Sequence, residues 1–264
     1  MAKPRDYGLD DPQPRRDFLA RLTLSALGVA GCQAKLGTSD VQSGPARLTA
    51  RVASPTREIE PGEHELVLSA GRNGLLYVPR SYVRGKPAPL VVLLHGAGGS
   101  ARNFFGSYGP RAEALGAVIL APESRGATWD AVRSEFYRDP PFIDLALKYT
   151  FEHCAIDSRR IALAGFSDGA TYAISLGLPN GDLFTHIIAY SPGFMRNQPP
   201  HGKPPIFVSH GVADAILPIA STSRQIVPAL RSRGYAVEYH EFDGGHEVPP
   251  AISTQALDWF LRTT

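Results

Sequence analysis

Runs of apolar residues divide the chain from about residue 63 onward into alternating predicted strands and helices. Two of them flank a turn at residues 71–74 and predict an antiparallel hairpin of His64–Ala70 with Leu75–Val78. Longer uninterrupted apolar runs are typical of strands that are buried on both faces. Such runs occur at Leu90–Leu94, Ala117–Ala121, Arg160–Ala164, His186–Ala189 and Ile206–Ser209, and an alternating run follows at Ala236–Phe242.

Segments with the helical spacing of apolar residues lie between these predicted strands. They are Arg102–Leu115, Pro141–His153, Gly169–Gly177, Ile219–Arg233 and Pro250–Leu261. This alternation predicts an α/β protein with a mostly parallel central sheet and helices on both faces. Residues 63–264 show no internal repeat, linker or long insertion. We therefore expect one domain there, without a large cap domain.

Composition and charge narrow the class of protein and of partner. Of the 264 residues, 43% are hydrophobic and 20% are charged, which supports a full core and excludes a disordered chain. The formal net charge is +2 and no basic block is present, so nucleic acid is not expected as a partner. Two cysteines, Cys32 and Cys154, exclude a disulfide framework, and the histidines lack metal-site spacing. The oligomeric state stays open.

The N-terminus is expected to direct export. An arginine pair at residues 15–16 precedes a short apolar stretch over residues 18–31, which resembles a twin-arginine export signal and is too short for a transmembrane helix. The stretch ends in VAGC at Cys32, which resembles the lipobox of bacterial lipoproteins. The alternative is a plain signal with an incidental cysteine.

Three parts of the chain follow from this resemblance. We expect a twin-arginine lipoprotein signal peptide over residues 1–31 and a lipidated Cys32 with a flexible tether over residues 32–62. An α/β domain occupies residues 63–264. The resemblance implies an exported protein of the bacterial cell envelope, anchored to a membrane by its N-terminal lipid.

A serine at a strand-to-helix turn is the first candidate for chemistry. Ser167 is the centre of the sequence GFSDG, which follows a predicted buried strand and precedes a helix of small residues. This is the context of a nucleophile elbow, in which flanking glycines leave room for a strained serine backbone. A serine hydroxyl is a weak nucleophile at neutral pH, so it needs a base and a carboxylate that orients the base.

Asp214 and His246 are the best candidates for these two roles. Asp214 lies in the loop after a buried strand, where the order serine, acid, histidine places the acid. Its alternative role is to cap the following helix, and Asp243 is the rival acid. His240 lies inside an alternating strand, whereas His246 follows two glycines in a loop before a helix. We therefore predict a triad of Ser167, His246 and Asp214.

An acyl-transfer site also needs N–H donors for the charge that develops on the carbonyl oxygen. The sequence HGAGG at residues 95–99 follows a strand and supplies a flexible loop, which His95 is expected to support. We expect the N–H groups of Asp168 and Ala97 to be the donors, with Gly96 as the alternative to Ala97. The spacing GxGxxG is absent, so a nucleotide site is not expected, and the chemistry requires no cofactor.

Two aromatic residues near strand ends are expected to wall the substrate pocket. They are Trp129, in the loop after the strand Ala117–Ala121, and Tyr190, after the strand His186–Ala189. Packing against neighbouring elements is the alternative for both. Cys154 is expected to be a buried apolar residue rather than a reactive thiol.

The set HGAGG, GFSDG, the Asp214 loop and the GGH of His246 resembles, in order and spacing, the α/β-hydrolase superfamily over residues 63–264. The form without a cap is similar to the phospholipase/carboxylesterase branch and to the polyhydroxybutyrate depolymerase and feruloyl esterase group. The resemblance implies an α/β-hydrolase fold and cleavage of small-molecule or lipid-like carboxylic esters through an acyl-enzyme. A serine peptidase or thioesterase with the same triad and a non-catalytic binding lipoprotein are the alternatives.

Overall fold

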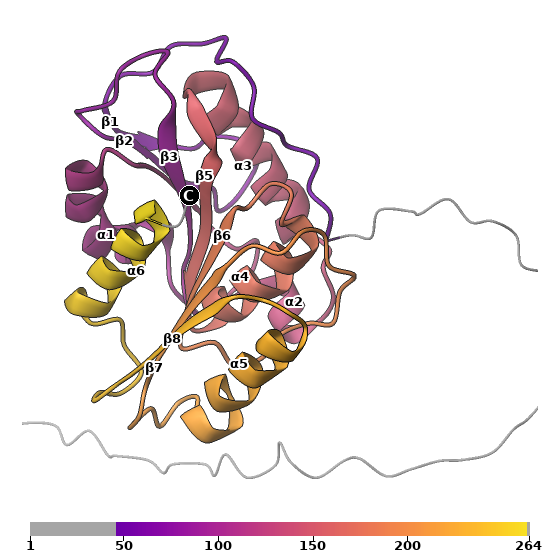
Figure 1. Cartoon of the computed structure of the whole chain (residues 1–264). Coiled ribbons are helices and arrows are strands. Elements are labelled where there is room, and N and C mark those ends of the chain that lie inside the picture. The colour runs from indigo at the N-terminus through magenta and orange to yellow at the C-terminus, as the bar shows by residue number, and fades with distance from the viewer. Residues whose placement is uncertain (1–45, 263–264) are drawn as a thin grey trace, which may run out of the picture. The chain divides into compact units, whose positions relative to one another are not determined.

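An eight-stranded, mostly parallel sheet organises the chain. The computed structural model describes residues 46–262, and its strands are β1 (Gly62–Glu65), β2 (Gly74–Val78), β3 (Ala88–Leu94), β4 (Val118–Pro122), β5 (Ile156–Phe166), β6 (His186–Tyr190), β7 (Ile206–Gly211) and β8 (Val237–Phe242). Their spatial order is β1-β2-β4-β3-β5-β6-β7-β8 (Figure 1). Neighbours from β4 to β8 are parallel, whereas β1 and β4 each pair with β2 in the antiparallel sense.

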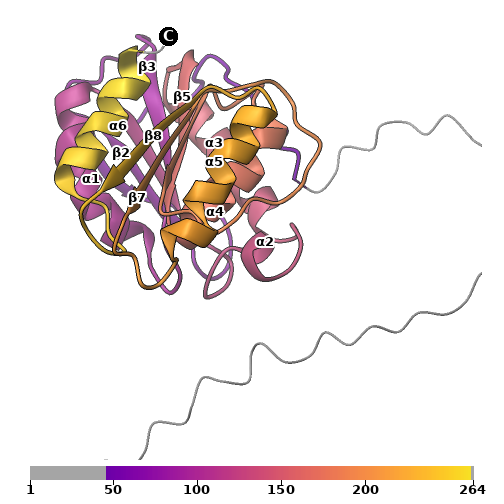
Figure 2. The ribbon, with the colours of Figure 1, turned by 60° about the horizontal axis from the view of Figure 1, so that its bottom comes forward.

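Helices cover both faces of this sheet. They are α1 (Ala101–Leu115), α2 (Asp130–Arg133), α3 (Asp139–His153), α4 (Asp168–Gly177), α5 (Ser223–Ser232) and α6 (Pro250–Arg262). The pair α1 and α6 lies on one face, and α2 to α5 lie on the other (Figure 1, Figure 2). The predicted α/β architecture is thereby confirmed. Among residues 46–262, no helix is long and apolar enough to span a membrane.

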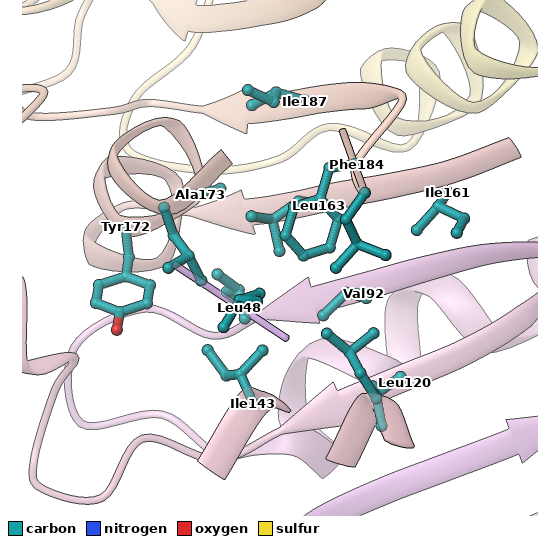
Figure 3. Close-up of a cluster of buried hydrophobic side chains, with 14 of the residues drawn as sticks. Leu48, Val92, Leu120, Ile143, Ile161, Leu163, Tyr172, Ala173, Phe184 and Ile187 are labelled. Carbon is teal, nitrogen blue, oxygen red and sulfur yellow. The ribbon is translucent and has the colours of Figure 1, made fainter. Parts of the chain in front are cut away.

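The central strands send alternate side chains into two cores, one on each face. Leu90, Val92 and Leu94 of β3 point into the core beneath α3, α4 and α5, whereas Val91 and Leu93 point into the core beneath α1 and α6. Figure 3 shows the first of these cores, where side chains of neighbouring strands and helices meet. Burial on both faces explains why these strands are uninterrupted apolar runs in the sequence.

The N-terminal hairpin is shorter than its apolar pattern predicts. β1 ends at Glu65 rather than at Ala70, although it pairs with β2 as expected. Asn73 ends the ladder, because its side-chain Oδ1 accepts hydrogen bonds from the N–H groups of Leu68 and Ser69 (both 3.0 Å). A side-chain amide therefore takes the place of strand pairing in this loop.

Residues 46–52 pack against the domain, and we call them the N-terminal strap. Leu48 is 3% exposed and lies in the first core together with Ala46 and Ala50 (Figure 3). The Asn180 side chain holds the strap backbone, because its Oδ1 accepts from Leu48 N–H (2.8 Å) and its Nδ2 donates to Ala46 O (2.7 Å). The strap is therefore a structural part of the domain.

This packing corrects the tether predicted for residues 32–62. The prediction was wrong for the strap, since Ala46, Leu48 and Ala50 are buried. Residues 53–61 form no helix or strand and are mostly exposed, and residues 32–45 lie outside the described part of the chain. Composition rich in Ser, Pro and Gly suggested flexibility, but apolar residues alternate with polar ones along the strap. Asp144 of α3 also holds the strap backbone, because it accepts hydrogen bonds from the N–H groups of Thr49 (2.7 Å) and Ala50 (2.6 Å). Composition gives no sign of this contact.

Replacing Leu48 by alanine tests the strap. We expect Leu48→Ala to lower the free energy of unfolding by about 2–5 kcal/mol, because it removes buried methyl groups and leaves a cavity. Val67 is 86% exposed, so Val67→Ala is the matched control and should change stability by less than about 0.5 kcal/mol. Urea denaturation of the full chain measures both. Equal midpoints for the two variants would contradict a packed strap.

Candidate active site

Four loops that follow parallel strands meet at the carboxyl edge of the sheet. They follow β3, β5, β7 and β8, and they carry the segment 95–99, Ser167, Asp214 and His246 in that order. β5 lies between β3 and β6, so Ser167 stands near the middle of this edge. Because parallel strands end at one edge, residues far apart in the sequence come together there.

Ser167 occupies a strained turn between β5 and α4. Its backbone has φ 57° and ψ −119°, which residues with a side chain rarely adopt. A Cβ on Gly165 would lie 2.2 Å from Gly169 O, and a Cβ on Gly169 would lie 2.1 Å from Leu94 O. Only glycine fits at these two positions, which lets β5, α4 and β3 approach closely. The Ser167 N–H donates to Tyr190 O (2.9 Å), which ties the turn to β6.

Ser167, His246 and Asp214 form a hydrogen-bonded series. His246 Nε2 lies 2.8 Å from Ser167 Oγ, and His246 Nδ1 lies 2.6 Å from Asp214 Oδ2. Asp214 is buried and its carboxylate accepts hydrogen bonds, so Nδ1 carries the proton and Nε2 is free to accept the serine hydroxyl proton. The Phe166 ring packs against the His246 ring with centroids 4.7 Å apart. The arrangement is chemically that of a serine nucleophile with its base and orienting acid.

The two oxygens of Asp214 have different partners. Oδ1 accepts hydrogen bonds from the N–H groups of Ile216 (2.9 Å) and Leu217 (2.8 Å), which stabilises a turn within the loop; Asp214 does not cap the following helix, which was its alternative role. This leaves Oδ2 for His246. Burial alone would raise the pKa of Asp214, but the N–H of Leu217 and the contact with His246 hold it below its ordinary value. The carboxylate is therefore charged over the neutral pH range.

Backbone contacts hold the acid and base loops together. A Cβ on Gly211 would lie 2.2 Å from Gly245 O and 2.4 Å from Gly244 O. The Ala213 N–H also donates to Gly244 O (3.0 Å). Glycine at position 211 is thus what allows the loops after β7 and β8 to touch, and this contact keeps His246 beside its acid.

The rival residues do not join the site. His240 lies within β8, stacks on the Phe207 ring at 5.0 Å between centroids, and has Nε2 3.0 Å from Glu238 Oε1. Asp243 is exposed at the surface. The structure therefore brings Asp214 and His246 to Ser167 and leaves the two alternatives outside.

The glycine-rich loop lies directly over the serine turn. A Cβ on Gly96 would lie 3.4 Å from Ser167 Cβ, and the Gly98 N–H donates to Ala127 O (2.8 Å). His95 is buried beneath the loop, with Nδ1 2.7 Å from Gly96 O and Nε2 accepting from the Ser124 N–H (3.1 Å). Burial lowers the pKa of His95, so it stays neutral and supports the loop by two directed hydrogen bonds.

Asp168 is the first residue of α4, and its N–H points out of the first helical turn. Such N–H groups have no intrahelical acceptor and can bind a negative charge. The Asp168 side chain is held by Thr128, whose Oγ1 donates to Oδ2 (2.6 Å). Our sequence reasoning assigned no role to Thr128, since its place in a long loop gave no sign that it would reach α4. The Ala97 N–H belongs to the loop over Ser167 and is the second candidate donor.

Trp129 and Tyr190 do not wall a substrate pocket. Both side chains are 0% exposed, so neither can contact a substrate in this structure. Trp129 Nε1 donates to His95 O (2.8 Å), and the Trp129 ring packs against Tyr172 with centroids 5.1 Å apart. The Tyr190 hydroxyl forms a hydrogen bond with Tyr108. The prediction for these two residues was wrong, because position after a strand does not say which way a side chain turns.

The part of the chain that the structure describes holds no cluster of three His, Cys, Asp or Glu side chains able to bind a metal ion. Cys154 is buried, and burial raises the pKa of its thiol to about 12. It therefore packs as an apolar residue.

Known proteins resemble this chain in sequence. The family described as phospholipase/carboxylesterase matches residues 138–264, a segment that contains Ser167, Asp214 and His246. A probable feruloyl esterase C of Aspergillus oryzae is 28% identical over 155 residues, which are 56% of each chain. Feruloyl esterase C of Emericella nidulans is 27% identical over 157 residues, 56% of this chain and 57% of the relative. The matched region thus spans little more than half the length of these curated relatives.

Solved structures share the architecture. Esterase PE8 is 23% identical, with a TM-score of 0.60 over 73% of this chain and 99% of that protein. An S-formylglutathione hydrolase from Staphylococcus aureus is 14% identical, with a TM-score of 0.62 over 77% of this chain and 98% of that one. At such low identity the likeness concerns the fold.

Comparing the two candidate acids tests this geometry. We expect Asp214→Asn to slow labelling of Ser167 by a fluorophosphonate probe by about three to four orders of magnitude, because the amide favours the wrong imidazole tautomer. Asp243→Asn is the matched control and should label at the wild-type rate. Mass spectrometry of the labelled peptide over time measures both rates. The reverse ranking would assign the acid to Asp243.

Proposed function

We propose that this chain, which has the α/β-hydrolase fold, is a serine hydrolase that cleaves carboxylic esters. The observation that carries the proposal is the series from Ser167 Oγ to His246 Nε2 (2.8 Å) and from His246 Nδ1 to Asp214 Oδ2 (2.6 Å). The strained backbone of Ser167 and the N–H groups around it add support. The match to the phospholipase/carboxylesterase family and the esterases among the relatives favour esters over other acyl compounds.

Acylation begins when Ser167 Oγ attacks the ester carbonyl carbon. His246 Nε2 takes the hydroxyl proton, and Asp214 stabilises the imidazolium that forms. The negative charge on the former carbonyl oxygen is bound by the N–H groups of Ala97 and Asp168. His246 then returns its proton to the alcohol oxygen, the carbon–oxygen bond of the ester breaks, and the acyl group stays on Ser167.

Deacylation repeats these steps with water. His246 Nε2 removes a proton from the water that attacks the acyl-enzyme, and the same N–H groups bind the oxyanion. Collapse of the intermediate breaks the bond to Ser167 Oγ, which recovers the proton from His246. The carboxylic acid leaves, and the free enzyme is restored.

The surroundings of the triad favour a substrate with apolar parts. Val212 and Ile216 are exposed on the loop that carries Asp214, and Phe194 is exposed on the loop after β6. The β6 and β7 loops are neighbours, since a Cβ on Gly193 would lie 3.5 Å from the Leu217 side chain. Exposed apolar side chains on the acid loop and on the loop next to it suit apolar acyl or alcohol groups. The two relatives named feruloyl esterase C make feruloyl esters one candidate class.

Ester hydrolysis by the full chain tests the proposal. We expect turnover of p-nitrophenyl esters in a series from acetate to palmitate, and Ser167→Ala should reduce it to background because no nucleophile remains. The chain-length optimum measures the space for the acyl group, and methyl ferulate tests the aromatic class.

Two other results would redirect the assignment. Fluorophosphonate labelling of Ser167 with turnover of anilide or thioester substrates alone would replace the esterase by a peptidase or thioesterase. Absence of both labelling and turnover would contradict a hydrolase and leave the binding lipoprotein.

We further propose that the protein is exported and held at a bacterial membrane by a lipid on Cys32. The proposal rests on the arginine pair at residues 15–16 and on the sequence VAGC that ends at Cys32, both of which lie outside the described residues. Lipidation would place the esterase domain in the cell envelope, where the substrate would have to be found.

Replacing Cys32 by serine tests the anchor. We expect Cys32→Ser to abolish incorporation of labelled palmitate in bacterial cells and to release the protein from the membrane fraction, because serine offers no thiol for acylation. Cys154→Ser is the matched control and should retain both, since Cys154 is buried in the domain. Membrane association of Cys32→Ser without label would contradict a lipid anchor.

A further inference from the structure

A second buried histidine contacts the acid of the triad. His210 lies in β7, and its Nε2 is 3.2 Å from Asp214 Oδ2, the oxygen that also faces His246. The same Nε2 lies 2.8 Å from Leu217 O, and Nδ1 lies 2.7 Å from the Ser223 hydroxyl. The side chains of His210 and Asp214 are both fully buried. A chain of contacts thus runs from Ser223 at the start of α5 to Ser167.

The partners of His210 determine its tautomer. Leu217 O and the Asp214 carboxylate can only accept hydrogen bonds, so Nε2 carries a proton. Nδ1 then accepts a hydrogen bond from the Ser223 hydroxyl. Burial lowers the pKa of His210, which keeps the ring neutral at physiological pH. His210 therefore places one neutral N–H beside two acceptors, with Leu217 O at 2.8 Å and Asp214 Oδ2 at 3.2 Å, and adds no positive charge.

We propose that His210 is a positioning residue, which sets the orientation and the charge of Asp214 through its Nε2–H and thereby tunes the basicity of His246. The inference rests on the proposed triad chemistry. Oδ1 of Asp214 is already held by the N–H groups of Ile216 and Leu217, and His210 Nε2, whose N–H is hydrogen-bonded to Leu217 O, lies 3.2 Å from the oxygen that faces the base. His210 also binds Leu217 O and so holds the acid loop from both sides.

The nearest other carboxylate, that of Glu241, is engaged by other partners and does not bind His210. Glu241 is paired with His210 in the β7–β8 register, but its carboxylate is bound by the Arg224 guanidinium of α5 (2.7 and 2.9 Å) and by the Tyr239 hydroxyl (2.9 Å). The remaining ionisable groups that face the ring are Asp214 and His246. A neutral donor weakens the charge on Asp214 Oδ2 only in part, whereas a cation at this position would compete directly with the His246 imidazolium for the carboxylate.

The sign of the effect follows from this arrangement. An N–H donor withdraws part of the negative charge from Oδ2. Without it, Asp214 stabilises protonated His246 more strongly, and the base loses its proton at a higher pH. Loss of His210 also removes a contact of Oδ2 and of Leu217 O, which lets the acid loop shift, displaces the imidazole and lowers turnover.

Three substitutions at one position separate a donor from a space-filling side chain. His210→Gln places an amide N–H near the position of Nε2, His210→Asn reaches only the position of Nδ1, and His210→Leu has similar bulk without a donor. We expect His210→Leu and His210→Asn to lower kcat for a p-nitrophenyl ester by about 10- to 100-fold, with KM nearly unchanged. The acidic limb of the kcat/KM profile should move up by about half a pH unit. His210→Gln should recover most of kcat and the wild-type limb.

A double-substitution cycle shows whether His210 acts through Asp214. In the Asp214→Asn background, His210→Leu should change kcat less than twofold, because the acceptor that it positions is gone. An effect of the single-variant size in that background would overturn the inference. So would wild-type kcat and pH limb in His210→Leu, or equal losses in His210→Gln and His210→Asn.

A separate measurement tests the proposed esterase activity itself. Ser167→Ala and the wild-type chain decide whether Ser167-dependent hydrolysis exists. If it does not, the proposed function fails, and the pH dependence of fluorophosphonate labelling of Ser167 in the same His210 variants replaces the ester assay. The role of His210 is supported if the acidic limb of the pH profile of the labelling rate shifts in His210→Leu and His210→Asn but not in His210→Gln. An unshifted limb in all three variants overturns it.

Discussion

The close approach of backbone at the Ser167 turn is the constraint on which the site depends. A strained residue of this kind costs on the order of 1–3 kcal/mol and persists only where the surroundings over-determine it. Here Gly165 meets Gly169, and Gly169 meets the carbonyl of Leu94 at the end of β3. The packing that creates the strain also brings the glycine-rich loop over the serine, so nucleophile and candidate oxyanion donors are positioned by one contact.

A similar backbone contact organises the other half of the site. Gly211 at the end of β7 meets Gly244 and Gly245 in the loop after β8. The acid and the base therefore sit on two loops that touch through main-chain atoms, where a shift of either loop is limited by the sheet beneath it. Asp214 accepts hydrogen bonds from its own loop with Oδ1, and its Oδ2 faces His246. One carboxylate thus stabilises its own loop and orients a distant histidine.

Buried polar side chains beneath these loops link the site to the core. Trp129 and His95 support the glycine-rich loop from below, Thr128 binds Asp168, and His210 contacts Asp214. Each of these four side chains donates to an acceptor, which offsets the cost of removing the donor from water. Polar support of this kind keeps a site rigid while the residues that meet substrate stay few.

The sequence by itself determined the order of strands and helices, the two-faced burial of the sheet, and the residue types of the site. Local periodicity encodes which faces are buried, and the glycines on either side of Ser167 mark a close backbone approach that only glycine permits. The tertiary structure decided which acid meets His246, since Asp214 and Ser167 are 32 and 79 residues away from it and meet it only through strand order. It also turned Trp129 and Tyr190 inward and packed the strap around Leu48. Side-chain direction in loops depends on contacts between distant segments, and no local pattern records them.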